Sequence, residues 1–495
     1  MMVEQVLQNL SQFVPETVLL VTFCAVILTD VILKGRPMAA LGVGLAGTVA
    51  AGILAAGQFG APQAVFHGMI SVDPFAAFFK VLVAVSTVLV FLISLYSSEV
   101  RSAVKRMGEY SALIVSATLG MFLMAGASNL LMIVLALELT SLSSYILAGY
   151  TKEAPDSSEA SLKYILYGAM SSGVMLYGIS LVYGLTGATE LTGVRIALAA
   201  GAGVNYPLLL VASIMIVVGF GYKISAVPFH FWTPDVYEGA PITITAFLSV
   251  GSKAAGFAMM IRFFVTTSYG DLGSMLGVLQ GFEWPKLVAI ISVLSMTLGN
   301  LVAIWQDNLK RMLAYSSIAH AGYMLMGVVV FTQNGLSAVL IYLVVYMFMN
   351  LGAFYVVMLV AGATGSEDIN AYRGLSQRAP LLSVALVIFL ISLTGLPPTA
   401  GFVGKLYIFS ALLDAKWMWL AVIGAINSVI SLYYYVRVVR NMYLRDTEVS
   451  APPVVLTRPQ TVLLFVMLIP TLLLGLYFAP LVDLAHASVA LFGVR

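Results

Sequence analysis

The sequence predicts an all-α polytopic membrane protein with about fourteen transmembrane helices. Of its 495 residues, 61% are hydrophobic and 9% are charged, whereas soluble domains carry roughly 25% charged residues. The mean hydropathy is +1.00, and apolar runs long enough to cross about 30 Å of hydrocarbon recur along the chain. A water-facing surface cannot be built from this composition, so we expect one transmembrane domain over residues 1–495.

The apolar runs place the expected helices in chain order, with short connections between them. The twelfth run is too long for one straight crossing and contains two glycines and two prolines between residues 395 and 401. We therefore expect this crossing to consist of two half-helices. The seventh run is interrupted by Pro228, five residues after Lys223. The expected spans are 16–33, 38–57, 74–95, 110–128, 129–150, 163–185, 206–231, 239–264, 286–304, 311–331, 334–361, 380–413, 417–440 and 460–478.

The two broken spans, the seventh and the twelfth, stand five spans apart. This spacing predicts two five-helix repeats, made of spans 4–8 (residues 110–264) and spans 9–13 (residues 286–440). Because five is an odd number, the second repeat is expected to be inverted in the membrane, as in many transporters. Residues 1–109 would add three N-terminal helices, and residues 460–478 a last helix.

Lysine and arginine are distributed unequally between the two sets of loops. Fourteen belong to the side of the loop between spans 1 and 2, called here the positive-rich side, and five to the opposite side. Positive residues accumulate on the cytoplasmic side of membrane proteins, so both termini are expected on the outer, periplasmic side. We expect the inner (plasma) membrane of a bacterium; an organelle inner membrane or a thylakoid membrane is the alternative.

The side-chain inventory disfavours redox and metal chemistry on this chain. Cys24 is the sole cysteine, so an iron–sulfur cluster cannot be built within the chain. The four histidines contain no i,i+3 or i,i+4 pair that could hold a haem or a metal ion. A net charge of +2 provides no basic face for phosphates. We expect no cofactor, metal or nucleic-acid site on this chain.

Ionisable residues inside the spans are the candidate functional residues, because a charged side chain at a helix centre costs about 2.5–3.5 kcal/mol. Glu138 lies in the middle of a span and is followed by hydroxyl residues. Lys223 and Lys405 flank the two breaks, where freed backbone groups and water can solvate a charge. Lys253 lies deep in span 8. A buried lysine whose carboxylate partner moves can load and release a proton, so these residues predict a proton wire.

Four further residues are ambiguous by position alone. Lys163 opens span 6, where a functional role and snorkelling to the interface are equally compatible with the sequence. Lys80 lies about two turns into span 3, and we expect its side chain to snorkel. His230 and His320 are either relay members of the proton wire or hydrogen-bonded core histidines.

Two segments resemble signatures of the antiporter-like membrane subunits of respiratory complex I. They are residues 222–241, Tyr-Lys-Ile-Ser-Ala-Val-Pro-Phe-His-Phe-Trp-Thr-Pro-Asp-Val-Tyr-Glu-Gly-Ala-Pro, and residues 394–405, Thr-Gly-Leu-Pro-Pro-Thr-Ala-Gly-Phe-Val-Gly-Lys. The resemblance covers almost the whole chain. The run Pro-Asp-Val-Tyr-Glu-Gly-Ala-Pro most resembles the subunit N type (subunit 2) of NADH-quinone oxidoreductase. The lysine at position 405 and the short segment after the last span distinguish the chain from the M and L types.

The resemblance implies proton-translocating roles for Glu138, Lys163, Lys223, Lys253 and Lys405, with Lys163 near the Glu138–Lys223 pair. It implies that protons move from the positive-rich side towards Glu138 and Lys223, pass through Lys253 towards Lys405, and leave on the other side. NAD, FMN, iron–sulfur clusters and quinone would be held by partner subunits. The chain is therefore expected to be a subunit of a proton-translocating NADH:quinone oxidoreductase that carries no redox site itself.

Two other functions stay open at this point. The multi-subunit Na+(K+)/H+ antiporters share the fold that the resemblance implies, and they exchange a cation for protons. A mainly structural subunit would hold its partners together, but it gains nothing from charged residues inside its spans. The expected partners are the other membrane subunits of complex I, the lipid bilayer and protons.

Overall fold

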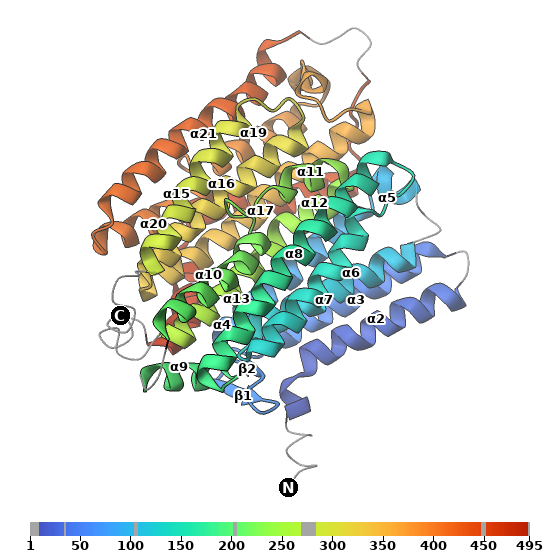
Figure 1. Ribbon diagram of the computed structural model, residues 1–495. Helices are drawn as coiled ribbons and strands as arrows, with labels where there is room; N and C mark the ends of the chain where they lie inside the picture. The colour runs from blue at the N-terminus through green and yellow to red at the C-terminus, as the bar shows by residue number, and fades with distance from the viewer. Residues whose placement is uncertain are drawn as a thin grey trace.

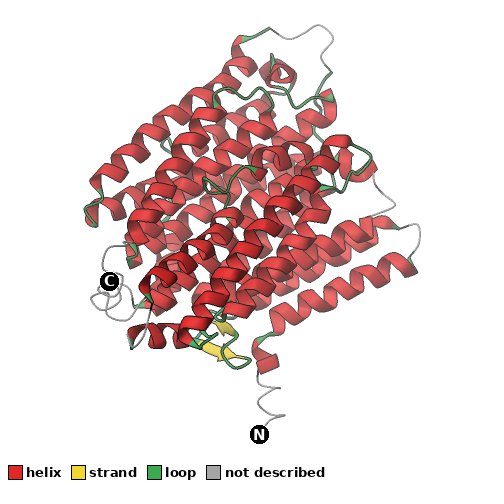
Figure 2. Ribbon diagram, viewed as in Figure 1, coloured by secondary structure: helices red, strands yellow, loops and turns green. Residues whose placement is uncertain are grey.

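The computed structural model describes residues 9–33, 36–102, 107–200, 205–268, 284–446 and 452–493. They form a bundle of helices, with one two-stranded hairpin at the end of the bundle near the N-terminus (Figures 1 and 2). Within these residues, thirteen helices are long and apolar enough to cross a membrane. The prediction of an all-α polytopic protein is confirmed. Four of the loop charges counted above lie outside the described residues: Lys34, Lys105, Arg106 and Arg495.

The helices long enough to cross the membrane follow one another in the expected order. They are α2 (Val14–Ile32), α3 (Pro37–Ala56), α4 (Pro74–Ser94), α6 (Met107–Gly126), α7 (Leu130–Ala148), α8 (Pro155–Thr186), α10 (Tyr206–Lys223), the continuous helix of α12 (Ile242–Phe247), η2 (Leu248–Ser252) and α13 (Lys253–Ser268), then α15 (Trp284–Ala303), α16 (Leu309–Val330), α17 (Gln333–Thr364), α21 (Met418–Leu444) and α22 (Arg458–Leu476).

Shorter elements connect these helices or cover their ends. They are β1 (Gln63–Val65), β2 (Ile70–Val72), α5 (Ser98–Ser102), α9 (Leu191–Ala199), α11 (Trp232–Gly239), η3 (Ile369–Tyr372), α18 (Leu375–Arg378), α19 (Pro380–Thr394), α20 (Ala400–Asp414), α23 (Ala479–Val489) and η4 (Ala490–Phe492).

Both helix breaks lie where the sequence places them. Helix α10 ends at Lys223, and the chain runs through a turn before α11 begins at Trp232. Helix α19 ends at Thr394 and α20 begins at Ala400, with Gly395 between them at a φ of +89°. A left-handed backbone of this kind favours glycine, which explains why the twelfth span breaks there. The division into two inverted repeats stays a prediction.

The helix α12–η2–α13, together with α16 and α17, forms the centre of the bundle. Nearly every residue of these three segments is buried, whereas most residues of α2, α8 and α22 are at least partly exposed. Helix α17 packs against α12, α16, α19, α20 and α22, and therefore joins the parts of the chain that carry Lys253 and Lys405. The apolar side chains on the outer helices are the surface that a lipid bilayer would cover.

A π-helical turn, η2, interrupts the central helix directly before Lys253. A π turn contains one extra residue compared with an α turn, and such turns are frequent at functional sites. Periodicity in the sequence gave no sign of it, since all five residues of the turn are buried. The turn sets the direction in which the Lys253 side chain leaves the helix.

A buried ion pair links α4 to α13 at the end of the bundle that carries the hairpin. The Arg262 guanidinium donates to both oxygens of Asp73, with Nη1–Oδ2 and Nη2–Oδ1 distances of 2.7 and 2.9 Å. The same carboxylate accepts from the Ala76 amide at 2.7 Å and so caps the first turn of α4. Arg262 Nε donates to the Ala125 carbonyl at 3.1 Å, which adds α6 to the assembly.

Stability in acid is expected to depend on Asp73. Burial alone would raise its pKa, but the charge and hydrogen bonds of Arg262 outweigh burial and hold the pKa below its usual value. The ionised Asp73 therefore stabilises the fold fully above about pH 4, which is the pKa of an aspartate in the unfolded chain. This contribution to the free energy of unfolding is lost as the pH falls below that value. Unfolding in detergent, followed from pH 7 to pH 3, should lose part of its acid dependence in Asp73→Asn. An unchanged acid dependence in that variant would contradict this assignment.

The expectation for Lys80 is wrong. Its side chain does not snorkel but is completely buried, and Nζ lies 2.6 Å from Glu16 Oε1 of α2. It also donates to Gln58 Oε1 at 2.9 Å. The carboxylate comes from a helix more than sixty residues away in the sequence, so the neighbourhood of Lys80 in its own span gave no sign of it. The pair fixes α4 to the N-terminal helices.

Candidate functional site

Glu138 and Lys223 lie near each other in the first half of the chain. Lys223 is the last residue of α10, directly before the break, and Glu138 lies on α7. The two charges interact electrostatically, but the described residues contain no ion pair between them. Instead, Lys223 Nζ donates to Ser141 Oγ at 3.2 Å. Ser141 is one helical turn from Glu138, so a hydroxyl lies beside both groups.

Lys253 is bound by Ser317, as Lys223 is bound by Ser141. It is buried at the start of α13, and Nζ donates to both the carbonyl and the hydroxyl oxygen of Ser317, each at 2.6 Å. The hydroxyl of Tyr346, on α17, donates to the same Ser317 Oγ at 2.9 Å. Both of the oxygens that bind Lys253 are neutral.

His320 lies one turn along α16 from Ser316 and Ser317, in the buried centre of the bundle. Its Nδ1 is 2.7 Å from the Tyr342 hydroxyl, and its Nε2 is 3.5 Å from the Tyr435 hydroxyl. Tyr435 in turn shares a hydrogen bond with Ser316. His320 also interacts electrostatically with both Lys253 and Lys405. The histidine therefore lies between the two lysines within a hydroxyl-rich group.

Lys405 lies on α20, just after the second break, and its ammonium group is directed back towards that break. Nζ donates to the Thr394 carbonyl at 2.8 Å and to Ser428 Oγ at 2.9 Å. It also lies 4.3 Å from the centre of the Tyr323 ring, a geometry that stabilises a cation. The Thr394 carbonyl lies in the last turn of α19, and the C-terminal end of a helix carries partial negative charge. The break therefore creates the binding position of Lys405.

Lys163 lies in a charged cluster at the positive-rich end of the bundle. Nζ is 2.5 Å from Asp235 Oδ2 and 2.7 Å from Glu159 Oε1, and 35% of the side chain is exposed. Asp235 and Glu238 also pair with Arg311 of α16. The described residues show no hydrogen bond or ion pair from Lys163 to Glu138 or Lys223. The cluster borders a cavity of about 220 Å³.

His230 lies in the first break but is not joined to the lysines. The side chain is buried, and Nδ1 has no hydrogen-bond partner among the described residues. Its ring packs 4.5 Å from that of Phe231. The two histidines proposed as relay members therefore differ. His320 lies within the cluster of serine and tyrosine hydroxyls between Lys253 and Lys405, whereas His230 lies in the first break, outside that cluster.

The sequence indicated the charged groups of this site but not their partners. Ser317 and Ser428 bind lysines that are 64 and 23 residues away in the chain, and Tyr346 binds Ser317 from 29 residues away. Only tertiary packing brings these groups together. Ser141 could have been found, because it lies three residues after Glu138 on the same helix face. Within the described chain, no group of three His, Cys, Asp or Glu residues is placed to hold a metal ion.

Comparison with known proteins identifies the family. Residues 127–431 match the family described as NADH:quinone oxidoreductase/Mrp antiporter, transmembrane. A relative from Chloroherpeton thalassium, named NADH-quinone oxidoreductase subunit N 2, is 50% identical over 489 residues, which cover 98% of this chain and 95% of the relative. The chain belongs to the subunit N family of NADH-quinone oxidoreductases. The expectation drawn from the two signature segments is confirmed.

Two solved structures show the same fold. A chain of respiratory complex I from Thermus thermophilus with bound aureothin is 31% identical, with a TM-score of 0.78, covering 95% of this chain and 99% of that chain. A chain of the Mrp complex from Dietzia sp. DQ12-45-1b is 22% identical, with a TM-score of 0.79, covering 99% and 98%. The second likeness shows the fold alone. This member of the subunit N family is therefore a multi-pass membrane protein with an antiporter-like architecture.

Proposed function

We propose that this chain translocates protons through its buried lysines as a membrane subunit of complex I. The observation that carries the proposal is the arrangement of Lys223, Lys253 and Lys405. Each is buried inside the bundle with its ammonium group bound to neutral hydroxyl or carbonyl groups. Burying unneutralised charge is costly, and a structural subunit has no need of it. Groups that can gain and lose a proton explain why the fold keeps them.

The direction of transfer in this proposal is the one that the resemblance implies. Protons from the positive-rich side reach Glu138 and Lys223, pass to Lys253 through hydroxyl groups and water, and continue past His320 to Lys405. Each proton that leaves on the opposite side works against about 2.3 kcal/mol per 100 mV of membrane potential. The reaction that supplies this free energy takes place on partner subunits, which hold NAD, FMN, iron–sulfur clusters and quinone. The relatives' names and the complex I structure support this arrangement.

Lys163 has a different part in this proposal from the one that the resemblance implies. In the structure it is neutralised by Asp235 and Glu159, so it would act on Glu138 and Lys223 only if it left these partners. The membrane is proposed to be the inner membrane of a bacterium, since the relatives are bacterial, with both termini on the outer side. The other membrane subunits of complex I are the proposed partners.

The test is Lys223→Met in the intact complex, reconstituted in sealed vesicles with assembly checked on a native gel. We expect electron transfer and proton uptake to collapse or uncouple, with pumping reduced by roughly tenfold or more, because methionine cannot carry a proton. Lys152→Met, which removes an exposed loop lysine, is the control and should pump normally. Full pumping in Lys223→Met would overturn the proposal and favour a structural subunit. Sodium flux that replaces proton uptake in the unmodified complex would favour a cation/proton antiporter.

A further inference from the structure

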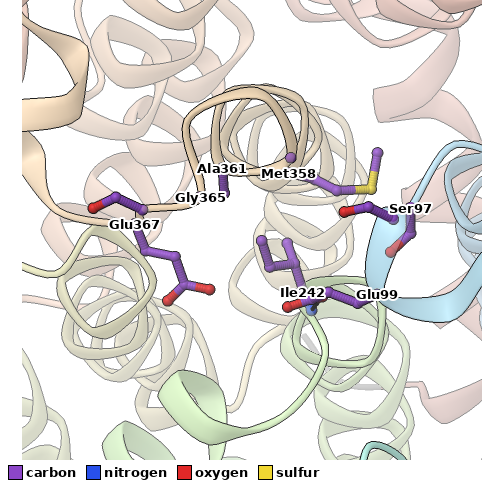
Figure 3. Close-up of a pocket in the computed structure, with 10 residues that line it drawn as sticks. Ser97, Glu99, Ile242, Met358, Ala361, Gly365 and Glu367 are labelled. Atoms are coloured by element: carbon purple, nitrogen blue, oxygen red, sulfur yellow. Dashed lines mark hydrogen bonds between the residues drawn. The ribbon is translucent and has the colours of Figure 1, made fainter. Parts of the chain in front are cut away.

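A cavity of about 280 Å³ lies at the positive-rich end of the bundle, away from Glu138 and Lys223. Its walls come from Ser97 and the start of α5, from the first residue of α12, and from the end of α17 with the turn that follows it. Figure 3 shows Glu99 and Glu367 on opposite sides of the space, with Ile242 below it and Met358 and Ala361 above it. The three loops that line it are ones that the predicted topology places on the same side of the membrane.

The two carboxylates of the cavity are fixed by neighbours at the start of the central helix. Glu99 Oε2 accepts from the Ile242 amide at 2.9 Å. Glu367 Oε1 lies 2.7 Å from Nζ of the buried Lys310, which also donates to the Ala240 carbonyl at 3.0 Å. The opening of the cavity, which carries the Glu99 and Glu367 carboxylates, is therefore attached to the start of α12. This helix continues through η2 to Lys253.

Polar side chains continue inward from this cavity along α12 and α17. Beside Glu99, the Tyr110 hydroxyl donates to Thr243 Oγ1 at 3.0 Å, one residue after Ile242. Deeper in the bundle, Asn350 Nδ2 donates to Ser249 Oγ at 2.7 Å. Asn350 is one turn along α17 from Tyr346, which donates to the Ser317 hydroxyl that binds Lys253.

Two buried polar atoms on this line lack a partner within the described residues. They are Asn350 Oδ1 and the Tyr237 hydroxyl. The Tyr237 ring packs 6.4 Å from that of Phe354, which lies one turn along α17 from Asn350. A buried polar group left without a hydrogen bond costs about 1–3 kcal/mol, and buried water is the usual partner. These two atoms therefore point to water between the cavity and Ser317.

We propose that this cavity is an aqueous vestibule that supplies protons to Lys253 directly from the positive-rich side, and that pumping requires this supply as well as the Glu138–Lys223 route. Glu99 takes a proton from hydronium in the opening of the cavity and releases it to the water bound by Tyr237 and Asn350. The last water transfers a proton to the lone pair of the neutral Lys253 amine, and water and hydronium are the sole reactants. This inference rests on the proposed function, because it assumes that Lys253 conducts protons.

Two substitutions in the intact complex test the vestibule. Glu99→Gln keeps an oxygen acceptor for the Ile242 amide but cannot titrate, and Ala361→Leu fills the space without touching a charge. In sealed vesicles, we expect each to lower proton uptake by roughly tenfold. Glu109→Gln is the matched control, because Glu109 is exposed on α6 at the same end and outside the cavity; it should pump normally.

Accessibility provides a second measurement that does not depend on pumping. In a Cys24→Ser background, Asn350→Cys should react with a water-soluble thiol reagent added on the positive-rich side, and adding Ala361→Leu should slow that reaction. Normal pumping in Glu99→Gln and Ala361→Leu, while Lys223→Met abolishes pumping, would overturn the vestibule alone. Normal pumping in all three variants would overturn the proposed function with it. Labelling of Asn350→Cys that Ala361→Leu leaves unchanged would also contradict the vestibule.

Discussion

Replacing Arg262 with leucine is expected to lower the free energy of unfolding by about 3–5 kcal/mol, because it leaves a buried carboxylate without its partner. Asp73 would keep its hydrogen bond from the Ala76 amide but would lose both bonds to the guanidinium. The Ala125 carbonyl would lose its donor as well. A single substitution would therefore remove the polar contacts that join α13 to both α4 and α6.

Chemical unfolding of the detergent-solubilised chain would measure this loss. Arg458→Leu is the matched control, because Arg458 is exposed at the start of α22, and surface substitutions of this kind change stability by about 0.5 kcal/mol or less. The double variant Asp73→Asn, Arg262→Leu should recover part of the loss, since it no longer buries an unpaired charge. Equal stability of Arg262→Leu and the unmodified chain would show that the pair contributes nothing.

Substituting Gly395 with alanine is expected to reduce proton pumping by roughly tenfold to a hundredfold, because it displaces the Lys405 side chain from its bound position. A Cβ atom at position 395 would lie 2.7 Å from Lys405 Cδ and 3.3 Å from Cε. The Lys405 side chain would then have to shift, which weakens the hydrogen bonds of its ammonium group to the Thr394 carbonyl and the Ser428 hydroxyl. The left-handed backbone at Gly395 adds about 1–2 kcal/mol of strain for any residue with a Cβ atom.

Gly187→Ala separates the two effects. Gly187 ends α8 at a φ of +66°, and a Cβ atom there would meet nothing within 4 Å. That variant therefore carries the same kind of backbone strain without contact to any lysine, and its pumping should equal that of the unmodified complex. Pumping in sealed vesicles, normalised to the amount of assembled complex, is the measurement. If the two variants behave alike, the position of Lys405 does not matter for transfer.

The sequence was sufficient to locate features that depend on nearby residues. The breaks after Lys223 and Thr394 were predictable because glycine and proline act within a few residues of where they stand. Lys253 and Lys405 could be recognised as candidate functional residues because they lie deep in apolar runs. That position can be seen without knowing which residues bind them. The signature around Lys223 also carried the family, and the relatives confirm it.

Features that depend on distant segments were not predictable in this way. The ion pair between Lys80 and Glu16 joins two helices, and periodicity describes only one helix at a time. Lys163 was expected near Glu138, but an acidic residue 72 positions further along the chain binds it instead. The hydroxyl partner of Lys253 is Ser317, which Tyr346 binds in turn. Serine and tyrosine occur throughout the spans and carry no individual signal.

The extra residue in η2 has a mechanical consequence for Lys253. Each residue of an α-helix advances the rotation by about 100°, so removing the extra residue would turn Lys253 away from Ser317 or twist the helix beyond it. Arg262 opposes that twist, because three hydrogen bonds hold it to Asp73 and Ala125. The α13 part of this helix is held by the hydrogen bonds of Arg262, and the part before Lys253 contains the extra residue of η2. Lys253 follows η2 directly, so the direction of its ammonium group depends on whether the π turn is kept.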